Sequence, residues 1–518
     1  MLDSAVLDQV RGVFADLHSS FVFRVTRDAN DEQSAEFTAF VEDVASCSEK
    51  ISTEYHDGEG FAFSLIRDGE DTGISFRGIP NGHEFTSLLL AVINADGRGR
   101  NLPDDTIVAR IKALKGKISL RTFVSLTCTN CPDVVQALNI MALTNPEVSS
   151  EMVDGGVCQD EVARLNIQGV PAVYVNGESL HVGRGDLGTL LQELEDRVGT
   201  TRDETSETIE RQYDVVVLGG GPAGVSAAIY SARKGLKVAV VAGRIGGQVN
   251  DTVGIENLIS VKHTTGTHLS GDLRTHLEEY PVDVFDNRTV IAANLKERVK
   301  SVSVRGGETF LAPAVIIATG AGWRRLGLPD ESKYIGHGEH FCPHCDGPFY
   351  KGKNVAVIGG GNSGVEAAID LAGICNHVTL LEYASSMRAD GVLQEKVHQF
   401  DNVTICKSTQ TTALIGDGSQ LSGLKVKDLT KDEERELDLD GVFVQIGLIP
   451  NSDVFADQLE LTPRREIPVD AFNRTALPGV YAAGDVTTVP FKQIMIAMGE
   501  GAKAALSAFD DRIRGVIA

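Results

Sequence analysis

Two segments of the chain share one pattern, in which an apolar strand runs into a glycine-rich turn and then into the start of a helix. The glycines are Gly219, Gly221 and Gly224 in the first segment, and Gly359, Gly361 and Gly364, with Ser363 beside them, in the second. Backbone N–H groups at such a helix start can hold the pyrophosphate of a dinucleotide. One such turn is weak evidence, but two turns of the same spacing predict two Rossmann-like α/β domains.

Two further segments strengthen the prediction for the first turn. A strand at 314–317 precedes Thr319 and Gly320, and a strand near the C-terminus precedes Gly484 and Asp485. An aspartate that follows a strand and a glycine is well placed to accept a hydrogen bond from a ribityl hydroxyl. We therefore predict that this domain binds FAD.

A carboxylate follows the second turn. Glu382 ends an apolar strand 18 residues after Gly364, where a side chain can bind the 2′-hydroxyl of NADH and repel the 2′-phosphate of NADPH. No pair of arginines follows it directly, so we expect NADH to be preferred, although Glu382 could also be a surface residue at a strand end. In the first domain Gly243 and Arg244 stand at the corresponding place, which leaves the adenosine-ribose contact of FAD open.

Four of the eight cysteines form two Cys-x-x-Cys pairs, Cys128 with Cys131 and Cys342 with Cys345. In a large chain this usage indicates redox or metal chemistry rather than structural disulfides. Zinc needs four ligands, and the two pairs are separated by about 210 residues, so we favour redox dithiols over a zinc site. The other cysteines stand singly, and we interpret them as packing residues: Cys47, Cys158, Cys375 and Cys406.

The first pair resembles the dithiol of thioredoxin. Cys128 precedes a predicted helix, whose dipole favours a thiolate, and Pro132 is tolerated in the first turn of that helix. About forty residues later, Pro171 opens a strand where thioredoxin-like folds keep a cis-proline beside the dithiol. We expect Cys128 to be the exposed attacking thiol and Cys131 to resolve the mixed disulfide.

The region before the first turn contains a weak internal repeat of two α/β units. Strands near 21–26, 51–55, 61–66 and 73–77 alternate with helices at 36–47 and 84–93, and the order recurs from Ile118 to Val198. The first unit has no cysteine at the matching junction, Asp28 to Asn30, so we predict a redox-inactive unit at 1–115 and a redox-active one at 116–198. The polar segment 199–212 is predicted to be a flexible linker.

The second pair lies between the two turns and is followed directly by Asp346. A flavin can reduce this pair, and a thiolate leaving group must be protonated when the pair then attacks the next disulfide. Asp346 is our candidate for that acid, and His344 is the alternative. The order of the motifs therefore predicts a pyridine-nucleotide-dependent flavoprotein disulfide reductase.

Nearly the whole chain resembles the flavoprotein subunits of bacterial alkyl hydroperoxide reductases, which are thioredoxin reductases with a doubled thioredoxin-like domain in front. The segments that carry the resemblance are 78–87, 128–138, 342–348 and 487–494. It implies a homodimer in which NADH, FAD, the second dithiol and the first dithiol pass electrons to a two-cysteine peroxiredoxin, which reduces alkyl hydroperoxides and hydrogen peroxide. It also implies that the NADH domain (326–450) is inserted in the FAD domain (213–325 and 451–518) and swivels.

The same resemblance assigns further residues. Gln248 and Asn257 would flank the flavin, and Lys492, Gln493 and Ile494 would lie at its pyrimidine edge. Glu84 of the inactive unit would face the first dithiol, although a carboxylate at a helix start is also favoured by the helix dipole alone.

Composition limits the partners and the location. The formal net charge of −24 argues against nucleic acid, whose phosphates attract concentrated Lys and Arg. No apolar run approaches the roughly 20 residues of a membrane span, and the N-terminus lacks a secretory pattern, so we expect a cytoplasmic protein. Two other functions stay open: an NADH oxidase that needs neither dithiol, and a flavin-bound redox sensor that does not turn over.

Overall fold

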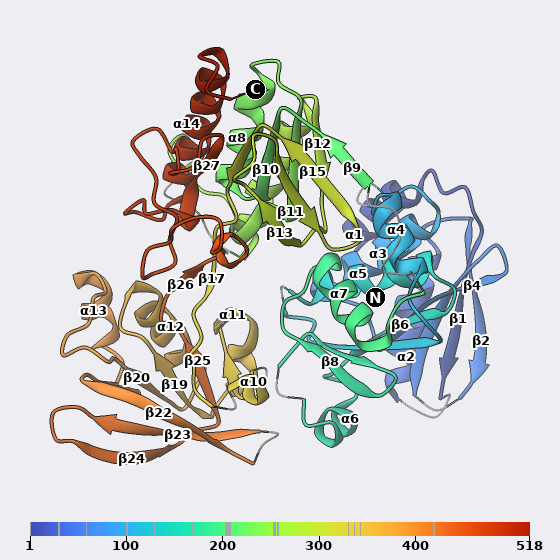
Figure 1. The fold of residues 1–518 in the computed structure, drawn as a ribbon. Helices are drawn as coiled ribbons and strands as arrows, with labels where there is room; N and C mark the ends of the chain where they lie inside the picture. Colours follow the sequence, from blue (N-terminus) through green and yellow to red (C-terminus); the bar gives the residue numbers. More distant parts are fainter. Residues whose placement is uncertain are drawn as a thin grey trace. The chain divides into compact units, whose positions relative to one another are not determined.

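The computed structural model describes residues 2–28, 32–58, 60–99, 102–128, 130–167, 169–201, 209–251, 255, 258–329, 331–335, 337–341, 343–417 and 420–517 (Figure 1). Its contacts divide the chain into two units. One contains 1–102, 114–199 and 324–447, and the other contains 103–113, 200–323 and 448–518. The first unit holds the thioredoxin-like domain and the second Rossmann-like domain, and the second unit holds the first Rossmann-like domain.

The N-terminal domain is built on one eight-stranded sheet of order β2-β1-β3-β4-β6-β5-β7-β8. In each half a parallel pair (β1 with β2, β5 with β6) is extended by two antiparallel neighbours, and β4 joins β6 in parallel. The predicted repeat of two thioredoxin-like units is therefore confirmed. The strands are β1 (Phe21–Arg27), β2 (Ile51–Asp57), β3 (Phe61–Arg67), β4 (Glu70–Arg77), β5 (Ile118–Val124), β6 (Val148–Asp154), β7 (Ala172–Val175) and β8 (Glu178–Val182).

Helices accompany this sheet at nearly the expected places. They are α1 (Ser4–Phe14), α2 (Glu32–Ala45), the 3-10 turn η1 (Gly82–Glu84), α3 (Phe85–Ala95), α5 (Cys131–Thr144), α6 (Gln159–Arg164) and α7 (Leu187–Val198). The helix α5 buries an almost continuous set of apolar side chains, from Val134 to Ala142, because it packs against the sheet and against α3. This packing fixes the end of α5 that carries the first dithiol.

The first Rossmann-like domain has a five-stranded parallel sheet of order β12-β11-β10-β16-β27. Its elements are β10 (Val215–Gly220), α8 (Pro222–Ala232), β11 (Val238–Ile245), η2 (Gly247–Asp251), α9 (Gly266–Glu278), β12 (Val282–Phe285), β16 (Ala314–Ile317), β17 (Ala321–Trp323), β26 (Leu448–Pro450), η4 (Asp453–Phe455), β27 (Val480–Ala482), η5 (Gly484–Val486) and α14 (Ile494–Ile513). The strand order reverses between β10 and β16, so a ligand site is expected at the carboxyl ends of these two strands.

The linker prediction is wrong for its last residues, because 209–212 form the strand β9 (Ile209–Gln212). This strand pairs in parallel with β15 (Glu308–Ala312), in a second sheet with β13 (Val290–Asn294) and β14 (Lys300–Val304). Three of its four residues are polar, so its sequence carries no strand pattern, and backbone hydrogen bonding holds it to the sheet edge. Residues 202–208 of the predicted linker lie outside the described residues.

The helix α4 (Asp105–Lys112) belongs to the same unit as this second sheet. Arg288, whose side chain is 1% exposed, contacts Asp104 through Nη1 at 2.8 Å and Glu308 through Nε at 2.7 Å. Glu308 also accepts from Arg211 Nε at 2.9 Å. Segment 103–113, which the sequence analysis placed in the N-terminal domain, is therefore held by a buried ion network to the sheet of β9 and β15.

The second Rossmann-like domain repeats this architecture, with a five-stranded parallel sheet β18-β25-β19-β20-β21 and a three-stranded antiparallel sheet β22-β23-β24. Its elements are α10 (Glu331–Tyr334), β18 (Glu339–His340), α11 (Pro343–Asp346), η3 (Gly347–Tyr350), β19 (Asn354–Ile358), α12 (Asn362–Ala372), β20 (His377–Leu381), α13 (Gly391–Val397), β21 (Val403–Cys406), β22 (Thr409–Gly416), β23 (Leu421–Asp428), β24 (Glu433–Asp438) and β25 (Gly441–Val444). The predicted fold class, tandem thioredoxin-like units followed by two Rossmann-like domains, is confirmed.

Candidate functional site

The first dithiol lies between β5 and α5. Both thiols are free, and the backbone N–H of Cys131, the first residue of α5, donates to Cys128 Sγ at 3.2 Å. The Val170–Pro171 bond is cis, and the carbonyl oxygen of Val170 lies 3.9 Å from Cys128 Sγ. Cys128 is only 1% exposed, so the expectation of an exposed first cysteine is wrong.

Cys131 is the more protected of the two thiols, with no exposed surface. Burial raises the pKa of Cys131 well above its ordinary value, and the neighbouring Cys128 and the carboxyl of Glu84 raise it further. The Cys131 thiol therefore stays protonated until a base removes its proton. A fully buried thiol that keeps its proton suits the resolving role.

Glu84 is a buried carboxyl in the first thioredoxin-like unit, with no exposed surface. Burial is the main cause that raises the pKa of Glu84 to about 7. Ser87 lowers this pKa, and the charge of Asp133 raises it, each by less than burial does. Among the described residues no hydrogen bond reaches either of its oxygens, and its side chain does not cap α3. The helix dipole alone therefore does not account for this carboxyl, which influences Cys131 across the repeat.

The first glycine turn has the geometry that a pyrophosphate requires. Gly219 has φ +112°, and a Cβ there would meet the carbonyl oxygen of Ala318 at 2.2 Å. A Cβ on Gly224 would lie 1.9 Å from the carbonyl oxygen of Gly219, whereas no described atom lies within 4 Å of a Cβ on Gly221. The turn therefore packs tightly against β16 and α8 on one side and leaves open space beside Gly221, at the N-terminus of α8, where an anion can lie.

A second helix start belongs to the same domain. The helices α8 and α14 lie side by side (Figure 1), and a Cβ on Gly501 would meet the carbonyl oxygen of Ala223 at 2.0 Å. Gln493 is the N-cap residue of α14 and Ile494 begins the helix, so the N–H of Ile494 has no intrahelical acceptor. This group can donate to a carbonyl oxygen of a flavin.

Two charged residues lie near this helix start. Burial raises the pKa of Asp485. The charge of Lys492 lowers this pKa, and the charge of Glu500 raises it. Gly484, just before Asp485, has φ +76° and donates its N–H to Glu500. Lys492 Nζ donates to the carbonyl oxygen of Thr487 at 2.5 Å and pairs with Glu466 at 3.2 Å, so Lys492 supports the loop before α14.

The remaining predicted flavin residues are placed as follows. Thr319 Oγ1 donates to the carbonyl oxygen of Asn451 at 2.7 Å, and Gly320 accepts from the N–H of Asn451 at 2.9 Å, so these two residues connect β16 to the return of the chain after β26. Gln248 lies half-buried in η2. Asn257 lies outside the described residues.

The second glycine turn reproduces the first. A Cβ on Gly359, which has φ +121°, would meet the carbonyl oxygen of Gln445 at 2.2 Å, and one on Gly364 would meet that of Gly359 at 1.8 Å. No described atom lies within 4 Å of a Cβ on Gly361, and Ser363 is exposed at the start of α12. The predicted dinucleotide turn therefore forms here with the same open space.

Glu382 stands directly after β20 and beside this turn. Its Oε2 accepts from the N–H of Gly360 at 2.6 Å, and its Oε1 accepts from the N–H of Ala384 at 2.7 Å. The carboxylate is thus fixed next to the glycines rather than extended into solvent. A carboxylate held at this place can accept hydrogen bonds from an adenosine ribose.

The second dithiol is described only in part. Cys342 and the side chains of Cys345 and His344 lie outside the described residues. Asp346, the last residue of α11, pairs with His340 Nδ1 at 3.1 Å, and His340 Nε2 lies 2.7 Å from the hydroxyl of Tyr350. The sequence analysis missed His340 and Tyr350, because no spacing rule links a residue of β18 to the ends of α11 and η3.

Other features of the described residues bear on the chemistry that the chain can perform. No three His, Cys, Asp or Glu side chains among them converge as a metal site requires. None of the described helices is both long and apolar enough to cross a membrane.

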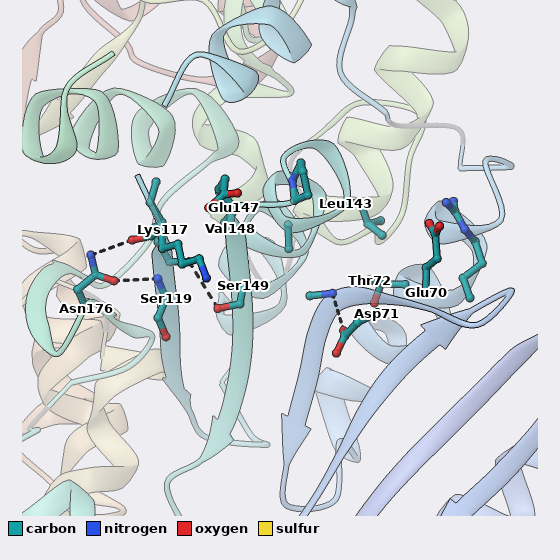
Figure 2. Close-up of a pocket in the computed structure, with 15 residues that line it drawn as sticks. Glu70, Asp71, Thr72, Lys117, Ser119, Leu143, Glu147, Val148, Ser149 and Asn176 are labelled. Atoms are coloured by element: carbon teal, nitrogen blue, oxygen red, sulfur yellow. Dashed lines mark hydrogen bonds between the residues drawn. The ribbon is translucent and has the colours of Figure 1, made fainter. Parts of the chain in front are cut away.

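One polar hollow of about 600 Å³ lies in the N-terminal domain, away from the dithiol (Figure 2). It is lined by the start of β5 around Lys117, the end of α5 around Leu143, and the acidic residues Glu70 and Asp71 near the start of β4. Because α5 rises about 1.5 Å per residue, Leu143 lies roughly 18 Å along the helix from Cys131. The hollow is therefore separate from the thiol chemistry.

Comparison with known proteins agrees with this geometry. Residues 213–501 match the family model for pyridine nucleotide-disulphide oxidoreductases, and residues 118–195 match that for a thioredoxin domain. Among solved structures, thioredoxin reductase of T. acidophilum is 38% identical with a TM-score of 0.54, and that of Lactococcus lactis is 32% identical with a TM-score of 0.55. Each covers 58% of this chain and 99% of the other.

The most extensive matches include the N-terminal domain. The F subunit of alkyl hydroperoxide reductase in Pseudomonas aeruginosa is 47% identical over 520 residues, which are 99% of both chains. The protein of the same name in Staphylococcus aureus is 45% identical over 515 residues, 99% of this chain and 100% of the other. The chain therefore belongs to the pyridine nucleotide-disulphide oxidoreductases and, within them, to the F subunits of alkyl hydroperoxide reductase.

Proposed function

We propose that this protein oxidises NADH and passes the electron pair through FAD, the Cys342–Cys345 pair and the Cys128–Cys131 pair to the disulfide of a two-cysteine peroxiredoxin. FAD and NADH are the cofactors, as expected for this family. The observation that carries the proposal is the first dithiol, in which a thiol that accepts a backbone N–H adjoins a thiol of raised pKa and a buried carboxyl. A reductase that acted on small molecules alone would not need the Cys128–Cys131 pair in addition to the Cys342–Cys345 pair.

The two turns support the cofactor assignment. In the first domain the open space beside Gly221 and the N–H of Ile494 at the start of α14 would hold FAD, and in the second the space beside Gly361 would hold NADH. When bound, the flavin takes a hydride from the nicotinamide and supplies two electrons to a disulfide. The two turns would fix where the phosphates lie. Each turn requires glycine at Gly224 or Gly364, because a Cβ there would collide with the backbone of its own turn.

Glu382 supports a preference for NADH over NADPH. Its two oxygens are held by backbone N–H groups, so the carboxylate stays next to the ribose position and would repel a 2′-phosphate. We expect NADH to bleach the flavin absorbance at concentrations where NADPH scarcely does. Equal bleaching by both nucleotides would remove Glu382 from this role.

The first dithiol exchanges electrons by two thiol–disulfide steps. The thiolate of Cys128 attacks one sulfur of the peroxiredoxin disulfide and releases the other as a thiolate. Cys131 then loses its proton to Glu84 and attacks Cys128 Sγ, which forms the Cys128–Cys131 disulfide and releases the second peroxiredoxin sulfur. Glu84 then passes the Cys131 proton to the second peroxiredoxin sulfur, and the first, released as a thiolate, takes from water the proton that Cys128 lost when it ionised, so two electrons and two protons are transferred in all.

The test is steady-state NADH consumption with a purified two-cysteine peroxiredoxin and a hydroperoxide. We expect Cys128→Ser to abolish coupled turnover while NADH still reduces the flavin, and Cys158→Ser to serve as a control with full turnover. Full coupled turnover of Cys128→Ser would remove the first dithiol from the route. Oxygen consumption that survives replacement of both Cys342 and Cys345 would favour an NADH oxidase, and no peroxiredoxin-dependent turnover at all would favour a sensor.

We further propose that the protein acts in the cytoplasm as a homodimer, as its resemblance to the flavoprotein subunits of alkyl hydroperoxide reductases suggests. Sedimentation of the FAD-loaded protein is expected to give twice the chain mass of 55.4 kDa. A monomer that retains full coupled turnover would contradict this assignment.

A further inference from the structure

Three side chains close in sequence to the second dithiol are connected by two polar contacts. Asp346 at the end of α11 pairs with Nδ1 of His340 at 3.1 Å, and Nε2 of His340 lies 2.7 Å from the hydroxyl of Tyr350 in η3. Asp346 directly follows Cys345 in the sequence. One carboxyl oxygen of Asp346 is therefore attached, through an imidazole, to a phenol in the domain core.

The imidazole of His340 has little freedom to turn. Its ring centroid lies 5.3 Å from that of Tyr350 and 5.4 Å from that of Phe443 on β25, and Tyr350 and Phe443 pack edge to face at 5.6 Å. His340 and Tyr350 are both buried, and a Cβ on Gly441 would meet the Tyr350 ring at 2.3 Å. This packing holds both ring nitrogens of His340 against their present partners.

The hydroxyl of Tyr350 determines where His340 carries its proton. Burial, and then the negative charges of Asp346 and Asp440, raise the pKa of Tyr350 beyond its usual range, so the phenol keeps its proton. Its acceptor among the described residues is Nε2 of His340. A neutral His340 must then carry its hydrogen on Nδ1 and donate it to Asp346, as the hydrogen-bond partner of one nitrogen fixes the proton on the other.

We propose that His340, held in one tautomer by Tyr350, is the positioning residue that aims Asp346 at the Cys342–Cys345 pair. This inference rests on the proposed function and adds to it that Asp346, the candidate acid of the sequence analysis, supplies a proton to that dithiol. The hydrogen bond from Nδ1 occupies one carboxyl oxygen, Oδ2, so Oδ1 is the oxygen that we assign to proton transfer.

The step that depends on Asp346 balances as follows. The Cys342–Cys345 disulfide accepts two electrons and one proton from the reduced flavin and one proton from the Asp346 carboxyl. Its Sγ–Sγ bond breaks into two thiols, and Asp346 is left as a carboxylate that accepts the Nδ1–H of His340. The hydrogen bond that His340 donates to Asp346 is therefore strongest after Asp346 has given up its proton and become a carboxylate.

Few other charged groups act on this chain of three. Besides Asp346 and Tyr350, His337 interacts electrostatically with His340. Around Tyr350 stand Asp440, Cys375 and Lys353, whose Nζ lies 5.3 Å from the ring centroid of Tyr350.

The test uses the full-length, FAD-loaded protein and two measurements as a function of pH. After one equivalent of NADH is added without oxygen, the return of the oxidised-flavin absorbance reports electron transfer to Cys342–Cys345. In chemically reduced protein, the alkylation of Cys342 and Cys345, followed by peptide mass spectrometry, reports their thiolates without turnover. The variants are His340→Leu, His340→Asn, Tyr350→Phe and Asp346→Asn, with the exposed His398→Gln as a control.

We expect His340→Leu to slow the absorbance return roughly tenfold at low pH, because a misaimed acid loses part of its catalytic contribution. The pH at which this rate falls should move upward, and the midpoint of alkylation should move downward, because Asp346 has lost a donor that favours its ionised form. His340→Asn, whose amide N–H can replace Nδ1–H, should restore the rate to within about threefold of the unaltered protein. Tyr350→Phe should shift both profiles in the same directions.

Two outcomes overturn the inference in distinguishable ways. If Asp346→Asn slows the absorbance return but His340→Leu and Tyr350→Phe leave both pH profiles unchanged, Asp346 acts without the chain of three. If Asp346→Asn leaves the return unchanged, the proposed role of Asp346 fails, and the role of His340 fails with it. Should His340→Leu not retain FAD, Tyr350→Phe decides alone, since it removes only one oxygen atom.

Discussion

Replacing Glu84 by glutamine should stabilise the N-terminal domain while impairing the first dithiol. Glu84 has no exposed surface, and burial raises its pKa from 4.5 to about 7. A neutral amide of the same shape avoids the cost of burying a charge. The same amide cannot accept the proton of Cys131, so thiol–disulfide exchange should slow.

The magnitude follows from the shift in pKa. A shift of 2.5 units, from 4.5 to 7, corresponds to about 3 kcal/mol at 1.36 kcal/mol per unit. Because the folded state binds this proton more tightly than the unfolded state, its stabilising contribution is complete below pH 4.5 and is lost as the pH rises to 7. Between about pH 5.5 and about pH 8.5, the unaltered domain should therefore lose about 2 kcal/mol that Glu84→Gln does not lose.

Hydrogen exchange in the full-length protein can measure this difference domain by domain. Peptides from β5 and α5 report the opening free energy of the N-terminal domain once intrinsic exchange rates at each pH are removed. Glu147→Gln, at an exposed carboxylate between α5 and β6, is the matched control and should change neither the stability nor its pH dependence. A stability difference between Glu84→Gln and the unaltered protein that stays constant with pH would refute the argument.

Three other substitutions test the remaining parts of the structure. Arg288→Met removes the main buried partner of Glu308 and should cost about 3–5 kcal/mol, measured by urea unfolding through the fluorescence of Trp323, the single tryptophan. Glu382→Ala should lower the ratio of kcat/KM for NADH over NADPH by about tenfold or more, the worth of a charged hydrogen bond, measured by initial rates. Gly224→Val places side-chain atoms within 2 Å of the carbonyl of its own turn, so the purified protein should lack flavin absorbance.

Much of the fold could be predicted because its signals are local. The alternation of strands and helices in the N-terminal domain was visible in the sequence, and the sheet order confirms two similar halves joined through β4 and β6. The helix α4 was missed because it lies outside the repeated pattern and is held by side chains that are distant in the sequence, Arg288 and Glu308. The strand β9 was missed because its sequence, Ile-Glu-Arg-Gln, shows no apolar alternation.

The candidate site divides in the same way. The glycine turns were predictable because the backbone itself requires glycine where a Cβ would collide with a carbonyl oxygen. The sequence placed Pro171 beside the dithiol, but the exposure of Cys128 was predicted wrongly because a motif does not show how closely neighbouring groups such as the Val170 carbonyl approach the thiol. His340 and Tyr350 were missed because their effect on Asp346 depends on the meeting of β18, α11 and η3, which no motif encodes.

The two Rossmann-like domains show how one turn can serve two cofactors. In both, a glycine of positive φ packs against a backbone carbonyl at the end of a neighbouring strand. Gly219 packs against Ala318 after β16, and Gly359 packs against Gln445 after β25. The two domains differ after the next strand, β20 or β11. After β20 the Glu382 side chain accepts from the N–H of Gly360, whereas after β11 the backbone N–H of Gly246 donates to the carbonyl oxygen of Gly220. The turn therefore provides a place for a pyrophosphate in both domains, whereas the proposed role of Glu382 concerns NADH against NADPH, because FAD and NADH carry the same adenosine ribose. A carboxylate at that place is what the NADH domain has and the FAD domain lacks.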